Sequence, residues 1–184
     1  GFRERDEDDW PLSRTRWTRL YLDTDGMALS PKSSEGAIAT TFAALGDGLT
    51  FLTPPLEEDI EITGPSAVKC FVSSTTSDAD LFVVLHVFSP DGEEVVFQGA
   101  IDPHTPIAQG WLRASHRKLD HKLSQPWRPY HSHDKKEALE PGVPVELDIE
   151  IWPTSIVVPA GYRVGLSLRG KDYEYAQAAG ERLS

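Results

Sequence analysis

One uninterrupted apolar run limits what this chain can fold into more than any other feature of its sequence. Residues 81–88 read Leu-Phe-Val-Val-Leu-His-Val-Phe, so an extended backbone here presents apolar side chains on both faces. Such a run is typical of a central strand covered from two sides, and we expect Val84 and Leu85 to be buried on opposite faces. Residues 89–92, Ser-Pro-Asp-Gly, predict a turn, and residues 95–97 are expected to run back as the hairpin partner.

The other expected strands are shorter and alternate between apolar and polar residues, which indicates one buried face. They lie at residues 17–22, 50–53, 60–62, 66–74, 145–151 and 162–169. We expect the last two to pair, with the acids of one and the arginines of the other on a shared solvent face. Periodicity leaves residues 110–119 open between helix and extended chain, whereas residues 30–49 and the proline-rich residues 120–144 predict loops. Short strands between Gly, Pro and Asp turns are typical of a sandwich or barrel.

Length and charge fit a single acidic domain. We expect residues 1–9 to be a linker and residues 10–184 to form one domain, since 184 residues can bury a substantial core. No apolar run reaches the ~20 residues of a membrane helix. The first nine residues lack a signal-peptide core, which leaves the compartment open with the cytoplasm slightly favoured. With 29 acidic against 18 basic residues, the net charge of −11 argues against nucleic-acid binding.

No nucleophile for acyl chemistry is predicted. A serine hydrolase carries its nucleophile on a Gly-x-Ser-x-Gly turn between a strand and a helix. The nearest approach, residues 165–170, reads Gly-Leu-Ser-Leu-Arg-Gly, which is one residue too long and lies within an alternating strand. Ser167 is therefore expected to be an ordinary strand residue, and Cys70 a small buried hydrophobe. We expect no catalytic residue in this chain.

Two polar clusters could bind metal but have simpler interpretations. His131, His133 and Asp134 are potential zinc ligands in an extended segment. Asp78 and Asp80 could hold calcium, although carboxylates in such a turn more often accept hydrogen bonds from nearby backbone amides. We expect neither a metal nor a cofactor.

The aromatic residues outside the strand pattern are the best candidates for binding. Trp111, Trp127 and Tyr130 could form a platform on which sugars stack. Alternatively, Trp10, Trp127, Arg128 and Tyr130 form a protein interface, since tryptophan, tyrosine and arginine carry much of the binding energy of interfaces. A third interpretation is that these rings plug the open ends of the sandwich.

Five motifs stand in a fixed order between about residues 10 and 173. They are Trp10-Pro11 before Arg19-Leu20-Tyr21-Leu22, Leu56-Glu57-Glu58-Asp59 before Gly64-Pro65, Ser77-Asp78-Ala79-Asp80 before Ser89-Pro90-Asp91-Gly92, Gly110-Trp111-Leu112-Arg113-Ala114-Ser115-His116-Arg117, and Trp152-Pro153-Thr154 before Ala160-Gly161-Tyr162-Arg163-Val164. In this order they resemble the C-terminal domain of the X-Pro dipeptidyl-peptidase and cocaine esterase family of serine hydrolases.

The resemblance implies an all-β, galactose-binding-like jelly-roll sandwich that follows an α/β-hydrolase domain. It implies an extended conformation for residues 111–117. Such enzymes cleave esters or X-Pro amides with a triad in the hydrolase domain, so no residue here is carried over as catalytic. The implied role is to pack on that domain in cis and shape its pocket, or to support a homo-oligomer. The alternative is an independent carbohydrate-binding module. The resemblance fades after Tyr173, so the sandwich is expected to lack its last strand.

Overall fold

The computed structural model describes residues 3–33, 36 and 39–175. Within them the chain forms strands joined by loops and a single turn of 3-10 helix. These elements are β1 (Tyr21–Asp23), β2 (Ala28–Ser30), β3 (Leu49–Leu52), β4 (Ile60–Val72), β5 (Asp80–Phe88), β6 (Ala108–Arg113), η1 (Ala114–His116), β7 (Val145–Val158) and β8 (Arg163–Arg169). No helix in this described part is long and apolar enough to span a membrane.

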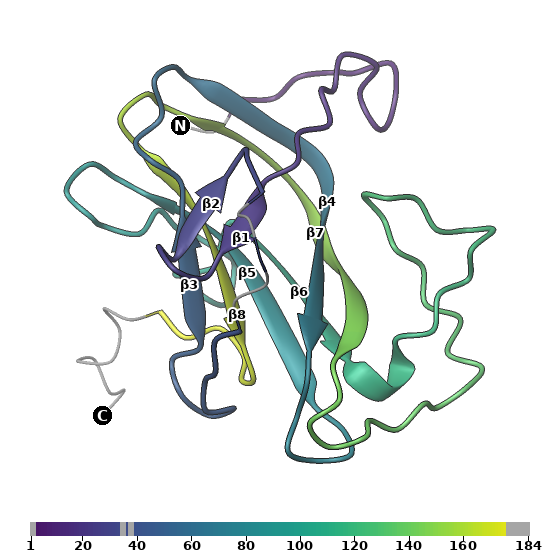
Figure 1. Cartoon of the computed structure of the whole chain (residues 1–184). Helices are drawn as coiled ribbons and strands as arrows, with labels where there is room; N and C mark the ends of the chain where they lie inside the picture. The colour runs from purple at the N-terminus through teal and green to yellow at the C-terminus, as the bar shows by residue number, and fades with distance from the viewer. Residues whose placement is uncertain (1–2, 34–35, 37–38, 176–184) are drawn as a thin grey trace.

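The strands form two sheets that pack face to face (Figure 1). The larger sheet has the order β1-β2-β3-β8-β5-β6, and the smaller one consists of β4 and β7. Only the β2–β3 pair among these neighbours is parallel. Strands far apart in the sequence therefore lie side by side, with β8 inserted between β3 and β5. The expected all-β sandwich is confirmed.

β5 is the central strand that the apolar run predicts. It lies between β8 and β6, and its side chains Val83 and Val84 are 0% and 1% exposed although they point to opposite faces. Leu85 differs from the prediction because it is only half-buried. It pairs with Ala108, where β6 begins, so β8 is the one strand that still flanks residues 86–88 of β5.

The hairpin expected after β5 forms only in part. Residues 89–92 make the expected turn, in which Gly92 N donates to Ser89 O at 2.9 Å, but residues 95–97 form no strand. The returning chain reaches only the end of β5, where Val95 N donates to Val87 O at 2.8 Å and Glu94 bridges to Phe88.

The expected pairing of residues 145–151 with 162–169 is also wrong. β7 pairs along its whole length with β4, from Ile60 opposite Val158 to Val72 opposite Val145, while β8 joins the other sheet. Alternation fixes which face of a strand is buried, but not which strand lies beside it. The acids of β7 therefore share their solvent face with a lysine of β4: Lys69 pairs with Glu146 and, at 3.0 Å, with Asp148.

Residues 17–22 also depart from their prediction. The first strand begins at Tyr21 rather than Trp17, and the Trp17 ring stacks on Trp127. β2, which pairs with β1 and ends at Ser30, was not expected from the sequence. The loop expected at residues 30–49 is confirmed where the structure describes it, since residues 31–33, 36 and 39–48 form neither strand nor helix.

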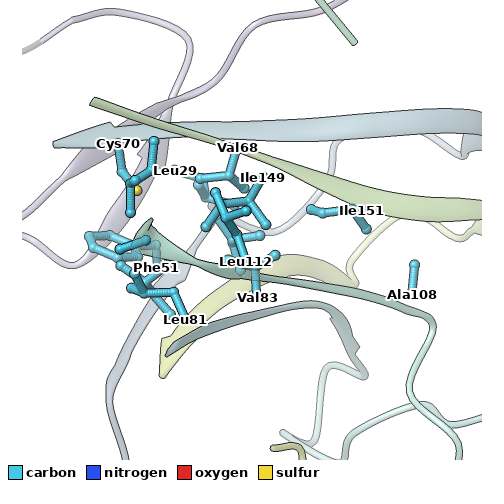
Figure 2. Close-up of a cluster of buried hydrophobic side chains, with 14 of the residues drawn as sticks. Leu29, Phe51, Val68, Cys70, Leu81, Val83, Ala108, Leu112, Ile149 and Ile151 are labelled. Atoms are coloured by element: carbon cyan, nitrogen blue, oxygen red, sulfur yellow. The ribbon is translucent and has the colours of Figure 1, made fainter. Parts of the chain in front are cut away.

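The main core lies between the two sheets (Figure 2). Its members are almost entirely excluded from solvent, and burying each large aliphatic side chain contributes about 1.5–3 kcal/mol. They include Leu29, Phe51, Val68, Cys70, Leu81, Val83, Ala108, Leu112, Leu147, Ile149 and Ile151. Cys70 is 8% exposed, and burial raises its thiol pKa to about 12, which fits the predicted inert hydrophobe.

A close approach between β6 and β7 closes the sandwich along one side. A Cβ atom at Gly110 would lie 1.7 Å from the backbone oxygen of Glu150, so only glycine fits there. After Arg113 the chain turns into η1 rather than staying extended. The extended conformation expected for residues 111–117 is therefore confirmed up to Arg113 and wrong for residues 114–116.

Candidate functional site

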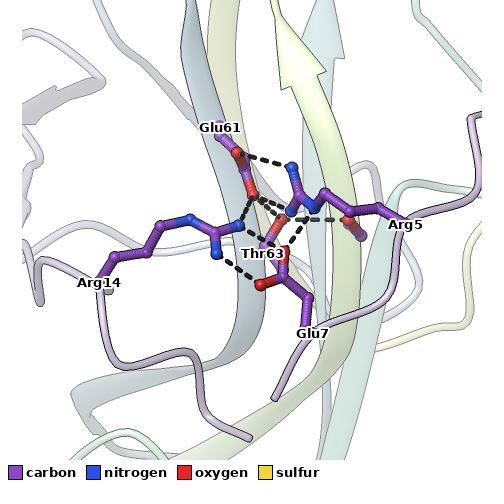
Figure 3. A network of polar contacts seen from close by, with 6 residues as sticks. Arg5, Glu7, Arg14, Glu61 and Thr63 are labelled. Atoms are coloured by element: carbon purple, nitrogen blue, oxygen red, sulfur yellow. Dashed lines mark hydrogen bonds and ion pairs between the residues drawn. The ribbon is translucent and has the colours of Figure 1, made fainter. Parts of the chain in front are cut away.

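A network of ion pairs ties the N-terminal segment to β4 (Figure 3). Glu61 accepts hydrogen bonds from Arg5 Nη2 at 2.6 Å and from Arg14 Nη2 at 3.3 Å. Arg14 also makes a bidentate pair with Glu7, with both contacts at 2.6 Å. The hydrogen bond from Arg5 is the main reason that the pKa of Glu61 falls to about 2. The network holds the chain on both sides of Trp10.

Trp10 lies between these anchors with its side chain at the surface. It is 59% exposed, whereas Leu12, two residues on, is only 6% exposed. The backbone is therefore fixed on the domain while the indole faces solvent. A large amphipathic ring in such a position is typical of a contact with another protein surface.

The proline-rich loop presents a second group of aromatic side chains. Trp127 is half-buried because its ring stacks on Trp17, with centroids 4.2 Å apart and planes 15° from parallel. Arg128 is exposed and Tyr130 is 49% exposed. Within this loop Gln125 and Arg128 exchange two backbone hydrogen bonds of 3.0 Å. The loop is therefore held in shape by its own bonds.

We call these five residues, Trp10, Trp17, Trp127, Arg128 and Tyr130, the aromatic surface. The Trp17–Trp127 stack joins its two segments, which are far apart in sequence. Trp17 was not among the residues predicted for an interface, because the alternation of residues 17–22 predicts a strand there. Rings that closed the open ends of the sandwich would be shielded from solvent. Trp10 is exposed to solvent, so this interpretation does not fit Trp10.

The structure also brings Ser167 to a histidine and an acid. Ser167 Oγ lies 2.8 Å from His86 Nε2, and His86 Nδ1 lies 2.5 Å from Glu94 Oε1. The order serine, histidine, carboxylate is that of a hydrolase triad. However, Ser167 is 0% exposed and His86 3% exposed, and Ser167 lies within β8 rather than on a tight turn. A substrate carbonyl cannot reach this serine.

The hydrogen bonds that link Ser167, His86 and Glu94 instead satisfy buried polar groups. With Nδ1 as the donor to Glu94, Nε2 accepts from the Ser167 hydroxyl, so each ring nitrogen has one partner. The nearby Tyr173 ring lies 6.1 Å from that of His86, and burial followed by the charge of Glu94 raises the Tyr173 pKa. Sequence reasoning did not pair His86 with Ser167, although each is the buried polar residue of its strand.

The turn at Asp78 behaves as the simpler interpretation predicts. Its carboxylate accepts hydrogen bonds from Ala79 N at 3.0 Å, from Ser115 N at 3.0 Å and from Ser115 Oγ at 2.6 Å. Asp80 pairs with Arg113 through two contacts of 2.7 Å. These carboxylates hold the β5–β6 end of the sheet together.

The three aromatic residues of the proposed sugar platform do not stack as one surface. Trp111 pairs with Trp152 at 4.9 Å and an angle of 56°, whereas Trp127 pairs with Trp17. A separate open depression of about 450 Å³ has Arg163 as its one charged lining residue. Its lining is Gly26, Met27, Ala28, Thr50, Leu52, Pro54, Pro55 and Arg163. Arg163 donates to the Thr53 carbonyl, so no acid–base pair faces this space.

The fold is that of an all-β sandwich domain. Comparison with known proteins identifies the family to which it belongs. Over residues 1–183 the chain matches the X-Pro dipeptidyl-peptidase C-terminal non-catalytic domain, and it belongs to this family.

Individual relatives are longer proteins. A protein of Mycobacterium bovis named as a serine esterase is 32% identical over 129 residues, which are 67% of this chain and 19% of that protein. The cocaine esterase of a Rhodococcus strain is 22% identical over 92% of this chain and 32% of its own length. The crystal structure of a CocE/NonD family hydrolase from Staphylococcus aureus superimposes with a TM-score of 0.89 at 25% identity, covering 92% of this chain and 31% of that one. The chain thus spans a fifth to a third of these relatives.

Proposed function

We propose that the chain serves an α/β-hydrolase-type serine hydrolase, of the X-Pro dipeptidyl-peptidase or acyl esterase class, by packing on its catalytic domain in cis. In this role residues 10–184 are the sandwich domain, and residues 1–9 are the linker, of which Arg5 pairs with Glu61 of β4. The domain walls the substrate pocket or supports pairing of subunits. The aromatic surface supports this proposal most directly, because a fixed backbone there presents Trp10 at 59% exposure.

The contact is expected to be mixed rather than purely apolar. In the sequence, Arg128 stands between Trp127 and Tyr130. Arginine, tryptophan and tyrosine are the residue types enriched among those that dominate the binding energy of interfaces. Trp127 would lose its remaining exposed area on docking, while its stack on Trp17 keeps the ring oriented beforehand. Such preorganisation reduces the entropy cost of association.

Three results test the proposal. The reading frame upstream of Gly1 is expected to encode an α/β-hydrolase domain, and its absence would refute the in-cis role. The isolated chain is expected not to hydrolyse p-nitrophenyl esters or X-Pro-anilides, whereas the hydrolase domain joined to it does. In the joined protein, replacing Trp127 and Arg128 by alanine is expected to change KM or the subunit assembly, while Trp111→Ala, on another part of the surface, leaves both unchanged.

A further inference from the structure

Three histidines gather where the proline-rich loop meets η1. His116 ends η1, while His131 and His133 lie in the loop that returns towards β7. The ring centroids of His116 and His133 are 5.4 Å apart, and those of His131 and His133 are 6.0 Å apart. We call these three residues the histidine cluster. It shares no residue with the aromatic surface, although His131 directly follows Tyr130 in the same loop.

The spacing of two ring nitrogens fits the coordination of a small divalent metal. His116 Nδ1 and His133 Nδ1 lie 3.3 Å apart. Two imidazole nitrogens bound tetrahedrally to zinc at about 2.0–2.1 Å are separated by about 3.3–3.4 Å, and their ring centres by roughly 5 Å. The His116–His133 pair therefore fits both the nitrogen–nitrogen distance and the distance between ring centres. The ring centres of His131 and His133 lie about 1 Å further apart than the second distance requires.

His131 supplies a nitrogen that nothing else uses. Its Nε2 is buried and has no hydrogen-bond partner, and a buried polar atom without a partner requires an explanation. The ring also interacts with the backbone of Asp148 through a hydrogen bond. That bond holds the other nitrogen as a donor, as is usual for metal-binding histidines, and leaves a lone pair on Nε2.

The histidine cluster differs from the ligand set predicted from the sequence, which was His131, His133 and Asp134. Asp134 accepts hydrogen bonds from Lys118 Nζ at 2.7 Å and from Ser132 Oγ at 2.5 Å. Asp134 is therefore committed elsewhere, and His116 takes its place beside His133. His133 itself has φ of 51°, a conformation that non-glycine residues seldom adopt and that often occurs at binding sites.

We propose that the histidine cluster binds one divalent transition-metal ion of the zinc type, with His116 and His133 as preset ligands and His131 as the third. Across the described residues, no group of three or more potential ligands is already arranged to hold a metal. Binding therefore includes a shift of the His131 ring by about 1 Å. Water completes the coordination, because His133 is exposed. The competing interpretation is a simple hydrogen bond between the two Nδ1 atoms.

Calorimetric titration of the untagged, EDTA-treated chain with zinc chloride at pH 7.5 tests the proposal. The expected result is saturable binding of one ion per chain, which weakens below pH 6 as protons compete for the imidazoles. His116→Ala and His133→Asn are each expected to weaken binding at least about tenfold, and His131→Ala by a similar factor. Asparagine at position 133 tolerates the positive φ, so a loss of binding there reports the missing imidazole rather than a disturbed loop.

His121→Ala is the matched control, because His121 is an exposed histidine in the same loop region. It is expected to leave zinc affinity unchanged within about twofold. Cobalt(II) provides a second readout, since a tetrahedral site gives strong visible absorption that the same variants should abolish. The absence of stoichiometric zinc binding, or binding that survives both His116→Ala and His133→Asn, would overturn the proposal. These measurements are independent of hydrolysis and docking, so their outcome leaves the proposed function untouched.

Discussion

Shortening one buried valine of β5 tests whether both faces of this strand are covered in the isolated chain. Val84 is 1% exposed and lies on the face opposite Val83. Val84→Ala removes two methyl groups, worth about 1.6 kcal/mol at ~0.8 kcal/mol each. A residual cavity adds to this, so the expected loss of unfolding free energy is about 2–3 kcal/mol. The matched control is Val157→Ala, the same change in β7 at 58% exposure, with an expected loss below about 0.5 kcal/mol.

Urea unfolding followed by tryptophan fluorescence measures both variants, with the slope m held as a check on the denatured state. For a chain of this size, 2–3 kcal/mol corresponds to a fall in Tm of about 5–10 °C. Leu85→Ala is expected to cost less per atom removed, because Leu85 is half-buried. A loss below about 1 kcal/mol at Val84, or one equal to that at Val157, would refute the two-sided cover of β5.

Three further outcomes follow from single contacts. Ser167→Ala removes the hydrogen-bond partner of His86 Nε2 and is expected to cost about 1–3 kcal/mol in urea unfolding; ester turnover that this change abolished would contradict the structural role. Gly110→Ala places a Cβ against the Glu150 backbone and is expected to cost at least about 2–3 kcal/mol, so a loss below about 1 kcal/mol would show that β6 and β7 do not touch there. Folding lowers the pKa of Glu61 from 4.5 to about 2. The contribution of Glu61 to the free energy of unfolding is therefore complete above pH 4.5 and is lost as the pH falls towards 2. The difference in Tm between the native chain and Glu61→Gln should therefore shrink over this range, and a constant difference would contradict the ion-pair assignment.

Side-chain patterning predicted burial well and strand pairing poorly. The apolar run of β5 and the alternation of β7 predict which faces of these strands are buried, and Val83, Val84 and Ile149 are buried as predicted. The partners of these strands were predicted wrongly. The short connection between β7 and β8 suggests a hairpin, but it crosses from one sheet to the other. Only the packing of both sheets decides between these outcomes.

The candidate sites show the same division. Exposure of Trp10 and Tyr130 follows from their position outside any strand pattern, so residue type and context were enough to select them. The stack of Trp17 on Trp127 joins positions 110 residues apart, and no local pattern encodes it. The same holds for His86 and Ser167, which meet because β5 and β8 are neighbours in register. The expectation that the sandwich lacks a last strand concerns a C-terminal stretch of which residues 176–184 lie outside the described structure.

Iodide quenching of tryptophan fluorescence tests the central claim, that the aromatic surface is a docking site, most directly. It is measured on the isolated chain and on the chain joined to its hydrolase domain, with Trp10→Phe and Trp127→Phe to assign the signals and Trp111→Phe as the control. The account predicts that iodide quenches Trp10 and, in part, Trp127 in the isolated chain, and that both are protected from quenching in the joined protein. Trp111, which is 52% exposed in the isolated chain, is expected to be quenched in both proteins. Equal quenching of Trp10 and Trp127 in the two proteins would contradict it.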